Sequence, residues 1–382
     1  MKRRFLAAAL IPLVCLSGCS GVGGLPYARE MENMALIRTL GVDTAEDGVQ
    51  VTASSARQRQ GDGETAALVL SGSARTVSAA CLTMQTYGTA YVFYGHVSQL
   101  LLGEDMARQG LREVLDYVER DLEMRLETEL FVVREATAEE AIFAASDSGS
   151  ASERLEAIRD DGGFAASAST RTIRDVLSDL YSNGASYAPG LELIPGREGD
   201  GGEGEKQLSA GLYAILRGDA LVGWAEGAAA LGINLLQGDV ESDVVEIPAE
   251  NGDSFALRVV EAESRVKAVF EGDTLAALEV ECQVEANLAQ APETFSDWEE
   301  AGLEELEREL ERIERNRVQA ALDLAQSLDA DFLGLGKRAG LAAPWRWHTL
   351  EQQWDSAFAD LPIRLTVEGK IQRSYDMMGQ ER

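Results

Sequence analysis

The sequence is very poor in histidine, with only His96 and His348 among its 382 residues. A zinc site or a serine triad needs histidine together with suitable neighbours, and the sequence supplies none beside these two. His96 follows a glycine at a bend in an apolar run, and His348 lies next to tryptophan residues. We interpret both as ordinary core or turn histidines, with a functional role as the less favoured alternative.

Cysteine is also scarce. Of four cysteines, Cys15 and Cys19 lie at the extreme N-terminus, which leaves Cys81 and Cys282 for the rest of the chain. Two thiols about 200 residues apart are not the disulfide framework of a small secreted domain. Because both have apolar neighbours, we expect two buried free thiols. A single disulfide between them is the alternative.

Positive charge is in short supply. The chain has 34 Lys and Arg against 65 Asp and Glu, which gives a formal net charge of −31. Nucleic-acid binding depends on basic side chains that displace counterions, so this class of partner is excluded. Anionic lipid headgroups would repel the chain as well. Any attachment to a membrane must therefore come from another source.

Motifs for cofactors and metals fail on inspection. A GxGxxG spacing at 199–204 lies among acidic residues, which would repel the phosphate that the dinucleotide fingerprint binds at a helix N-terminus. The turn Asp43–Gly48 begins like a calcium loop. However, Ala45 replaces an oxygen ligand and Ser54 replaces the terminal glutamate. We therefore expect no metal, no cofactor-binding residue and no catalytic residue, and we interpret the chain as a binding subunit and not an enzyme.

The N-terminus carries a clear export signal. Three basic residues precede an apolar run, Phe5–Leu16, that is too short to span a bilayer. The run ends in Leu16-Ser17-Gly18-Cys19, the pattern of a bacterial lipobox. We predict that residues 1–18 are a signal peptide and that Cys19 receives a diacylglycerol with palmitate-type acyl chains. The mature chain would then be a lipoprotein anchored on the extracytoplasmic face of a membrane, with 19–28 as the tether. An ordinary signal peptide is the alternative.

The remaining chain has two α+β regions. Residues 29–194 and 207–382 both contain alternating strand patterns and amphipathic helix patterns. Between them, 195–206 has five glycines, four acids and no apolar residue after its proline, which indicates a solvated linker or a long loop tip. The irregular mixture favours an α+β, multi-domain fold with mixed or antiparallel sheets flanked by helices.

Individual elements can be predicted with bounds. Residues 91–102 are interpreted as one buried strand with a bend, and 104–120 as one amphipathic helix. Thr137 and Glu140 have the spacing of a helix capping box. The segment 298–328 is predicted to be a long helix that packs against its own sheet. A coiled-coil seam for a partner is the alternative, which we favour less because the apolar repeat covers barely two heptads.

Several short stretches together resemble the C subunit of nutrient germinant receptors, the GerAC-like lipoproteins of endospore-forming bacteria. They follow the order of that family over nearly the whole mature chain. The stretches are Arg29–Asn33, Leu40–Asp43, Tyr94–His96, Leu101–Glu104, Ala107–Leu111, Arg120–Arg125, Gly211–Leu216, Leu221–Trp224, Asp331–Gly336, Trp345 with Trp354, and Leu361–Ile363.

This resemblance implies a three-domain lipoprotein of the spore inner membrane. Such subunits assemble with an A subunit and with a polytopic, transporter-like B subunit, and the complex triggers spore germination in response to nutrients. The sporulation-specific role implied is assembly and signalling of the germination response. The one residue-level function that the resemblance carries over is lipidation, on Cys19. The alternative is a solute-binding lipoprotein of an importer, although no repeat of two similar lobes is visible.

Overall fold

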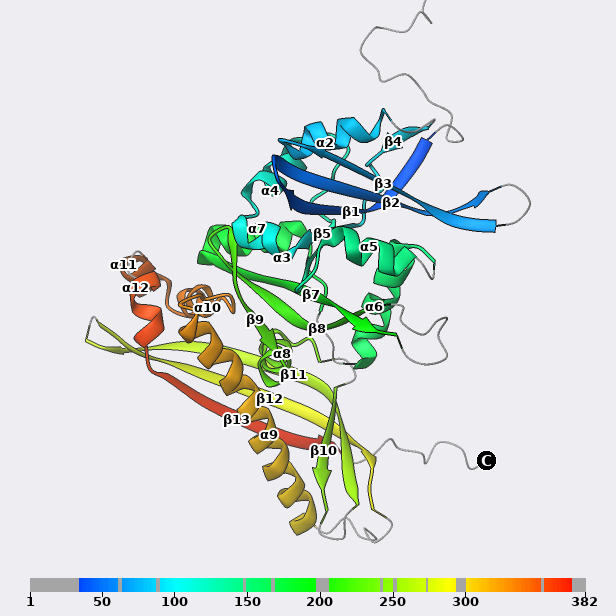
Figure 1. Cartoon of the computed structure of the whole chain (residues 1–382). Helices are drawn as coiled ribbons and strands as arrows, with labels where there is room; N and C mark the ends of the chain where they lie inside the picture. Colours follow the sequence, from blue (N-terminus) through cyan, green and yellow to red (C-terminus); the bar gives the residue numbers. More distant parts are fainter. Residues whose placement is uncertain are drawn as a thin grey trace, which may run out of the picture.

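The computed structural model describes residues 34–60, 64–86, 90–146, 149–165, 169–196, 206–240, 243–249, 253–272, 274–292, 300–351 and 354–372. These residues form two β-sheets with helices packed against them, arranged one after the other along an elongated molecule (Figure 1). The fold is α+β with mixed sheets and more than one domain, as the sequence predicts. The implied number of three domains stays a prediction.

The larger sheet has nine strands in the described part of the chain, in the order β3-β2-β1-β5-β6-β7-β8-β9, with β4 also paired to β1. Strands β1, β5, β6 and β7 run parallel, and antiparallel strands flank them on both sides. The strands are β1 Met34–Ala45, β2 Gly48–Gln60, β3 Glu64–Ala74, β4 Tyr91–Phe93, β5 Gln99–Gly103, β6 Glu129–Val133, β7 Ala185–Pro195, β8 Lys206–Arg217 and β9 Ala220–Glu226.

Helices cover both faces of this sheet. The apolar run in β5 shows why: Leu100 and Leu102 point into a core with α2, α4 and α7, whereas Leu101 points into a second core with α5 and α6. A strand buried on both faces therefore has apolar residues in succession, here Leu100 to Leu102. The helices are α2 Val77–Met84, α3 Glu104–Gln109, α4 Arg112–Arg120, α5 Ala138–Ser146, α6 Ala151–Ala165 and α7 Ile173–Asn183.

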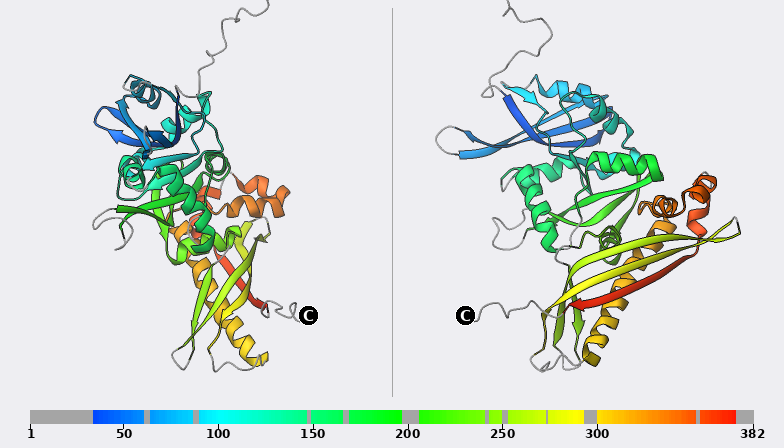
Figure 2. Two further views of the ribbon diagram at one scale, coloured as in Figure 1. Left: turned by 90° about the vertical axis from the view of Figure 1, so that its right-hand side faces the viewer. Right: turned by 180° about the vertical axis from the view of Figure 1, so that it is seen from behind.

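The smaller sheet has the order β10-β11-β12-β13, in which β12 and β13 are parallel and the other pairs are antiparallel. Its strands are β10 Val244–Pro248, β11 Ser254–Glu271, β12 Thr274–Gln290 and β13 Ile363–Gln372. The accompanying helices are α8 Ala228–Gln237, α9 Glu300–Ser327, α10 Leu335–Ala342, α11 Pro344–Leu350 and α12 Trp354–Ala357, followed by the 3₁₀ turn Phe358–Asp360. Figure 2 shows α9 lying along the sheet from two further sides.

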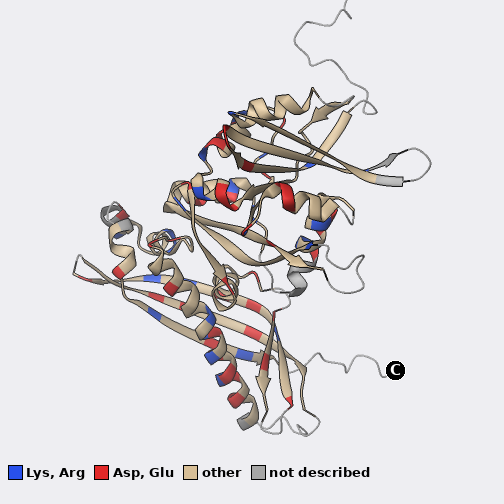
Figure 3. Cartoon of the chain, in the orientation of Figure 1, with Lys and Arg blue, Asp and Glu red and all other residues tan. Residues whose placement is uncertain are grey.

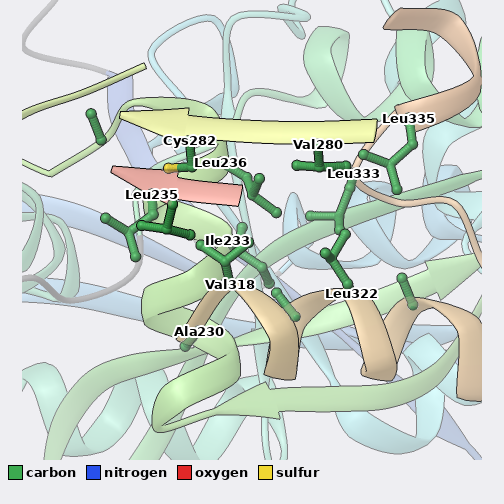
Figure 4. Close-up of a cluster of buried hydrophobic side chains, with 14 of the residues drawn as sticks. Ala230, Ile233, Leu235, Leu236, Val280, Cys282, Val318, Leu322, Leu333 and Leu335 are labelled. Atoms are coloured by element: carbon green, nitrogen blue, oxygen red, sulfur yellow. The ribbon is translucent and has the colours of Figure 1, made fainter. Parts of the chain in front are cut away.

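The long helix α9 packs against its own sheet, as predicted. Its buried side chains Val318 and Leu322 meet Ile233 of α8 and Val280 of β12 in one core (Figure 4). Burial of side chains of this size stabilises the fold by roughly 1.5–3 kcal/mol each. The apolar stripe of α9 is thus buried against other elements of the same chain.

Two predicted elements are each divided in the structure. The helix expected over 104–120 breaks into α3 and α4 at Gly110, whose φ of 135° is outside the range of other residues. The strand expected over 91–102 is two short strands, β4 and β5, which pair with successive parts of β1. In both places the apolar pattern continues through the break, because both pieces contribute to the same core.

The acidic segment predicted as a linker joins the two arms of a hairpin. Strands β7 and β8 pair antiparallel, from Ala185 opposite Arg217 to Pro195 opposite Lys206. The chain therefore re-enters the same sheet after residue 205. Residues 197–205 lie outside the described part. The division into 29–194 and 207–382 stays a prediction, while the strands on both sides of the segment belong to one sheet.

The two cysteines in the described part are free and buried, which confirms the prediction of buried thiols. Burial raises the pKa of both thiols, that of Cys282 to about 12. Within the described residues, no helix combines the length and the apolar composition that crossing a bilayer requires.

Candidate interaction groove

The residues singled out in the sequence are placed as follows. Cys19 lies outside the described residues. His96 is exposed in the turn between β4 and β5, with its ring 5.8 Å from that of Phe93, and so is a turn histidine. His348 lies in α11, and its side chain is outside what the structure describes. No group of three or more potential metal ligands occurs in the described part of the chain.

Asp43 has a structural task. Its carboxylate accepts hydrogen bonds from the backbone N–H groups of Ala138 (2.7 Å) and Glu139 (3.0 Å) at the start of α5. A carboxylate at this position satisfies N–H groups that have no partner inside the helix. Burial raises the pKa of Asp43, and these two bonds act in the opposite direction. The first residue of the calcium-loop-like turn is therefore committed to helix capping.

A second buried carboxylate, Asp331, organises the end of the fold where α10, α11 and α12 meet. It accepts hydrogen bonds from the N–H groups of Leu335 and Gly336, each 2.8 Å long, and from the indole N–H of Trp354 at 3.0 Å. Burial raises the pKa of Asp331 to about 7, against the effect of these donors. The stretch Asp331–Gly336 and Trp354, two separate parts of the recognised pattern, are thereby brought into contact.

Small residues on α10 make room for two tryptophans. A side chain at Gly336 would lie 2.6 Å from the Trp354 ring, and one at Gly340 would lie 2.6 Å from the Trp347 ring. The two indole rings are 4.9 Å apart and tilted toward each other. Helices α10, α11 and α12 are therefore held together by aromatic packing against a glycine face.

These helices form one wall of a groove with a volume of about 530 Å³. The end of α7 forms the other wall, where Gly184 ends the helix in a left-handed conformation with φ of 69°. The lining residues are Leu180, Tyr181, Ser182, Asn183, Gly184, Asp331, Gly336, Lys337, Gly340, Leu341, Trp347, Glu351 and Trp354. Figure 1 shows α7 and the α10–α12 group facing each other at one side of the molecule.

Large apolar side chains are exposed at this groove. Tyr181 of α7 is 81% exposed and Leu341 of α10 is 77% exposed. Trp345, which does not line the groove, is 84% exposed on α11, the helix that contributes Trp347 to the lining. Helix α11 is held in place by Arg346, whose guanidinium lies 4.8 Å from the centre of the Phe270 ring. Tyrosine and tryptophan are the residues that most often dominate protein–protein binding energy. The groove is thus suited to bind an apolar surface of another protein.

A second hollow of about 460 Å³ continues from the first past Tyr181 and Leu180, which line both. Its charged residues are Arg112 of α4 against three acids, Asp116, Glu119 and Asp219. The acidic residues are spread over much of the molecule (Figure 3). A partner that binds here meets an apolar groove with a mainly acidic margin, which favours a neutral or basic surface.

The sequence reasoning found part of this groove. Trp354 and Asp331–Gly336 were singled out through the resemblance, whereas Tyr181 and Leu341 were not. Trp345 was singled out as well, but it does not line the groove. The amphipathic pattern of α7 assigns an aromatic residue to the buried side, and only the tertiary structure shows that Tyr181 is exposed. No signal in the single sequence distinguishes these two cases.

The other buried charges form structural pairs. Glu314 of α9, fully buried, contacts Arg317 at 3.0 Å, and Arg317 also contacts Asp243 at 2.5 Å. Burial raises the pKa of Glu314 to about 7, with a further increase from Asp243 and an opposing effect of Arg317. These groups lie between α9 and the chain before β10, away from both hollows, and so we assign them no binding role.

Two family models match this chain. The model "Spore germination protein N-terminal domain" covers residues 27–193, and the model "Spore germination B3/ GerAC like, C-terminal" covers residues 210–375. They meet at the hairpin of β7 and β8.

Two curated relatives and a solved structure agree with the match to these family models. "Spore germination protein KC" of Bacillus subtilis (strain 168) is 23% identical over 98% of this chain and 97% of its own length. "Putative spore germination protein YfkR" of the same organism is also 23% identical, over 96% of this chain and 95% of its own. The crystal structure of the GerBC protein has a TM-score of 0.56 at 16% identity, covering 92% of this chain and 99% of that one, which indicates a shared fold.

Proposed function

This chain belongs to the GerAC-like family of spore germination proteins. We propose on this basis that it is the lipid-anchored C subunit of a nutrient germinant receptor. In this proposal it resides on the outer face of the spore inner membrane and contributes to assembly and signalling together with A and B subunits. The family match across both halves of the chain supports the receptor role.

The membrane attachment rests on Cys19. The lipobox supports a thioether-linked diacylglycerol there, and the acyl chains would hold the protein by burying hydrocarbon, at roughly 0.8 kcal/mol per CH₂. Mass spectrometry of the mature N-terminus tests this directly. We expect a lipid mass on Cys19, and we expect Cys19→Ala to leave an unprocessed or soluble chain. An unmodified Cys19 in membrane-bound mature protein would contradict the anchor.

The observation that carries the partner role is the exposure of Tyr181 and Leu341 at one groove, with Trp345 exposed on α11, the helix that contributes Trp347 to the same groove. A monomer gains nothing from leaving such residues in water, because each could contribute binding energy when buried. We therefore assign the groove to the contact with an A or B subunit. The acidic margin favours a basic or neutral part of that partner.

Co-purification of the assembled receptor tests the assignment. The variants Tyr181→Ala and Leu341→Ala should each reduce recovery of the A and B subunits, by about tenfold or more if the residue dominates the contact. Val260→Ala is the matched control, because Val260 is exposed to 40% on β11 and does not line the groove. Full recovery with both groove variants would place the contact elsewhere.

Calorimetry distinguishes the receptor subunit from the solute-binding alternative. The chain alone is expected to give no micromolar binding of amino acids or sugars, and no catalytic turnover. Micromolar binding of such a nutrient, combined with no recovery of A or B subunits, would favour the solute-binding lipoprotein instead.

A further inference from the structure

One stretch of the chain lacks charged residues altogether. Residues 76–103 contain no Asp, Glu, Lys or Arg, although 26% of the chain is charged and about seven would be expected. The stretch includes α2, β4 and β5. Figure 3 shows α2 without charged residues at the end of the molecule. Part of the stretch is core, and the outer face of α2 is surface.

Much of the outer face of α2 is apolar or carries hydroxyl groups that are bonded within the chain, and Ser78 is exposed there as well. Leu82 is 68% exposed on this face. The hydroxyl groups of Thr83 and Thr86 donate to the carbonyls of Ala79 (2.9 Å) and Thr83 (2.7 Å) within the helix. These two hydroxyl donors need no water, so a nonpolar environment can replace water at little cost. Contact of this face with an apolar phase would therefore leave the two hydroxyl donors bonded.

Leu122 extends this surface from a second element. It is fully exposed, in the turn that follows α4. The acids on either side of it bind inward: Asp121 accepts from the N–H of Glu123 at 2.9 Å, and Glu123 accepts from the hydroxyl of Tyr91 (3.1 Å) and the N–H of Tyr94 (2.9 Å). The leucine is therefore the outermost group of a turn whose carboxylates are engaged in the fold.

The same hydrogen bonds place this surface beside the point where the N-terminal segment enters the fold. Met34, at the start of β1, pairs with Tyr91 in β4, and the hydroxyl of Tyr91 binds Glu123. The backbone of Val92 in β4 is bonded in both directions to the side chain of Gln85, just after α2. The end of α2, Leu122 and the start of β1 thus form one end of the molecule, as Figures 1 and 2 also show for α2, β4 and β1.

The length of chain before Met34 connects this end to the membrane. If Cys19 carries the lipid, the 15 residues from Cys19 to Met34 span at most about 50 Å. The start of β1 is therefore held within this distance of the bilayer, and α2 and β4 lie at the same end of the molecule.

We propose that the surface formed by Ser78, Ala79, Leu82, Thr86 and Leu122 is the membrane-facing surface of the protein and rests on the outer leaflet of the bilayer. The inference rests on the proposed lipid anchor and extends it to the orientation of the whole chain. Charge supports the choice of occupant. A chain with a net charge of −34 after loss of residues 1–18 is repelled by anionic headgroups, except where it presents no charge.

The test measures the distance of single probes from the lipid. The full lipidated chain is reconstituted in phosphatidylcholine–phosphatidylglycerol vesicles, with an environment-sensitive dye on Ala79→Cys. The matched control is Asn316→Cys, also exposed on a helix but in α9. The native Cys81 and Cys282 are buried and do not compete for the dye. Spin-labelled phospholipids should quench the dye at position 79 at least twofold more than at position 316. Equal quenching at both positions would overturn the inference.

A double variant tests the two leucines. Leu82→Asp with Leu122→Asp, both at exposed positions, should lower quenching at position 79 to the control level while the chain stays on the vesicles. Unchanged quenching in the double variant would overturn the inference. Protection of position 79 that appears only when A and B subunits are added would also overturn it, in favour of a protein contact.

The outcome can be separated from that of the anchor. In a second preparation, a histidine tag replaces residues 1–19 and binds a nickel-chelating lipid, which holds the chain at the same point without acylation. Mass spectrometry of the native lipidated chain then tests Cys19, and the quenching ratio of the tagged chain tests the orientation. Lipid on Cys19 with equal quenching at both probes would reject only the orientation. Absence of lipid with preferential quenching at position 79 would reject only the anchor.

Discussion

Trp354 donates its indole N–H to the carboxylate of Asp331 at 3.0 Å, across 23 residues of sequence and at the base of the groove. Asp331 also caps the start of α10 through two backbone N–H groups. One buried carboxylate thus fixes both the helix that carries Leu341 and the tryptophan that packs behind it. The position of the groove wall depends on this carboxylate together with the packing of Trp347 and Trp354 on α10.

Replacement of this tryptophan should destabilise the fold. In Trp354→Phe the ring volume is nearly retained, but one bond to a buried carboxylate is lost. A hydrogen bond to a charged group contributes about 1.5–3 kcal/mol. We expect the free energy of unfolding in urea to fall by about this amount. The control is Trp345→Phe, which should change it by less than about 0.5 kcal/mol because Trp345 is exposed. An equal loss in both variants would show that the bond to Asp331 has no special weight.

Stability should depend on pH through Glu314. Burial raises its pKa in the folded state to about 7, against about 4.5 when unfolded, so the folded state binds the proton more tightly. The resulting stabilisation is complete below pH 4.5 and is lost as pH rises through 7. Relative to Glu314→Gln, the wild type should lose about 3 kcal/mol between pH 4.5 and pH 8. Parallel curves of unfolding free energy against pH for the two proteins would contradict this.

Local patterns predicted local structure well. The capping box at Thr137 and Glu140 is present in both directions, with bonds of 3.1 and 3.0 Å, because each needs only groups within one helix turn. The apolar face expected over 104–120 is buried, yet the helix is broken at Gly110. The residues of this face are Met106, Leu111, Val114, Leu115 and Val118. The pattern records which side chains are buried, and it does not record the change of backbone direction.

Features set by distant pairing could not be predicted. A polar, glycine-rich segment such as 195–206 has the same composition in a domain linker and at the tip of a hairpin, because both are solvated. Only the pairing of β7 with β8 distinguishes them. The groove is a similar case: the contacts of Asp331 with Trp354 and of Gly340 with Trp347 depend on how three short helices fold back.

Close packing of α8 on α9 should make Gly232 irreplaceable. An added Cβ at this position would meet the backbone carbonyl of Arg317 and come within 3.0 Å of the Ala321 side chain. Alanine normally favours a helix over glycine by about 1 kcal/mol. Here we expect the opposite sign, a loss of about 1–3 kcal/mol from overpacking. Ala228→Ser, at an exposed position in α8, is the control for urea unfolding. A gain in stability for Gly232→Ala would show that the two helices can separate without cost.

The two buried thiols should not react with thiol reagents in the folded protein. Thiol reagents attack the thiolate, and burial raises the pKa of Cys81 and Cys282 so that little thiolate forms at pH 8. Mass spectrometry after iodoacetamide treatment should show no label on either residue in the native chain. After unfolding without reductant, both should be labelled. Failure to label them until a reductant is added would reveal a disulfide instead.

Cleavage of the chain within 197–205 should not separate its two halves. The ladder between β7 and β8 runs from Ala185 opposite Arg217 to Pro195 opposite Lys206. It holds the chain on both sides of the cut in one sheet. A protease site introduced between residues 197 and 205 is expected to give two fragments in denaturing gels. In native size-exclusion chromatography, however, the fragments should elute together at the volume of the intact protein. Uncut protein with the same insertion is the control. Separation of the fragments under native conditions would mean that the segment is a linker between independent domains, and that the pairing of β7 with β8 contributes little to cohesion.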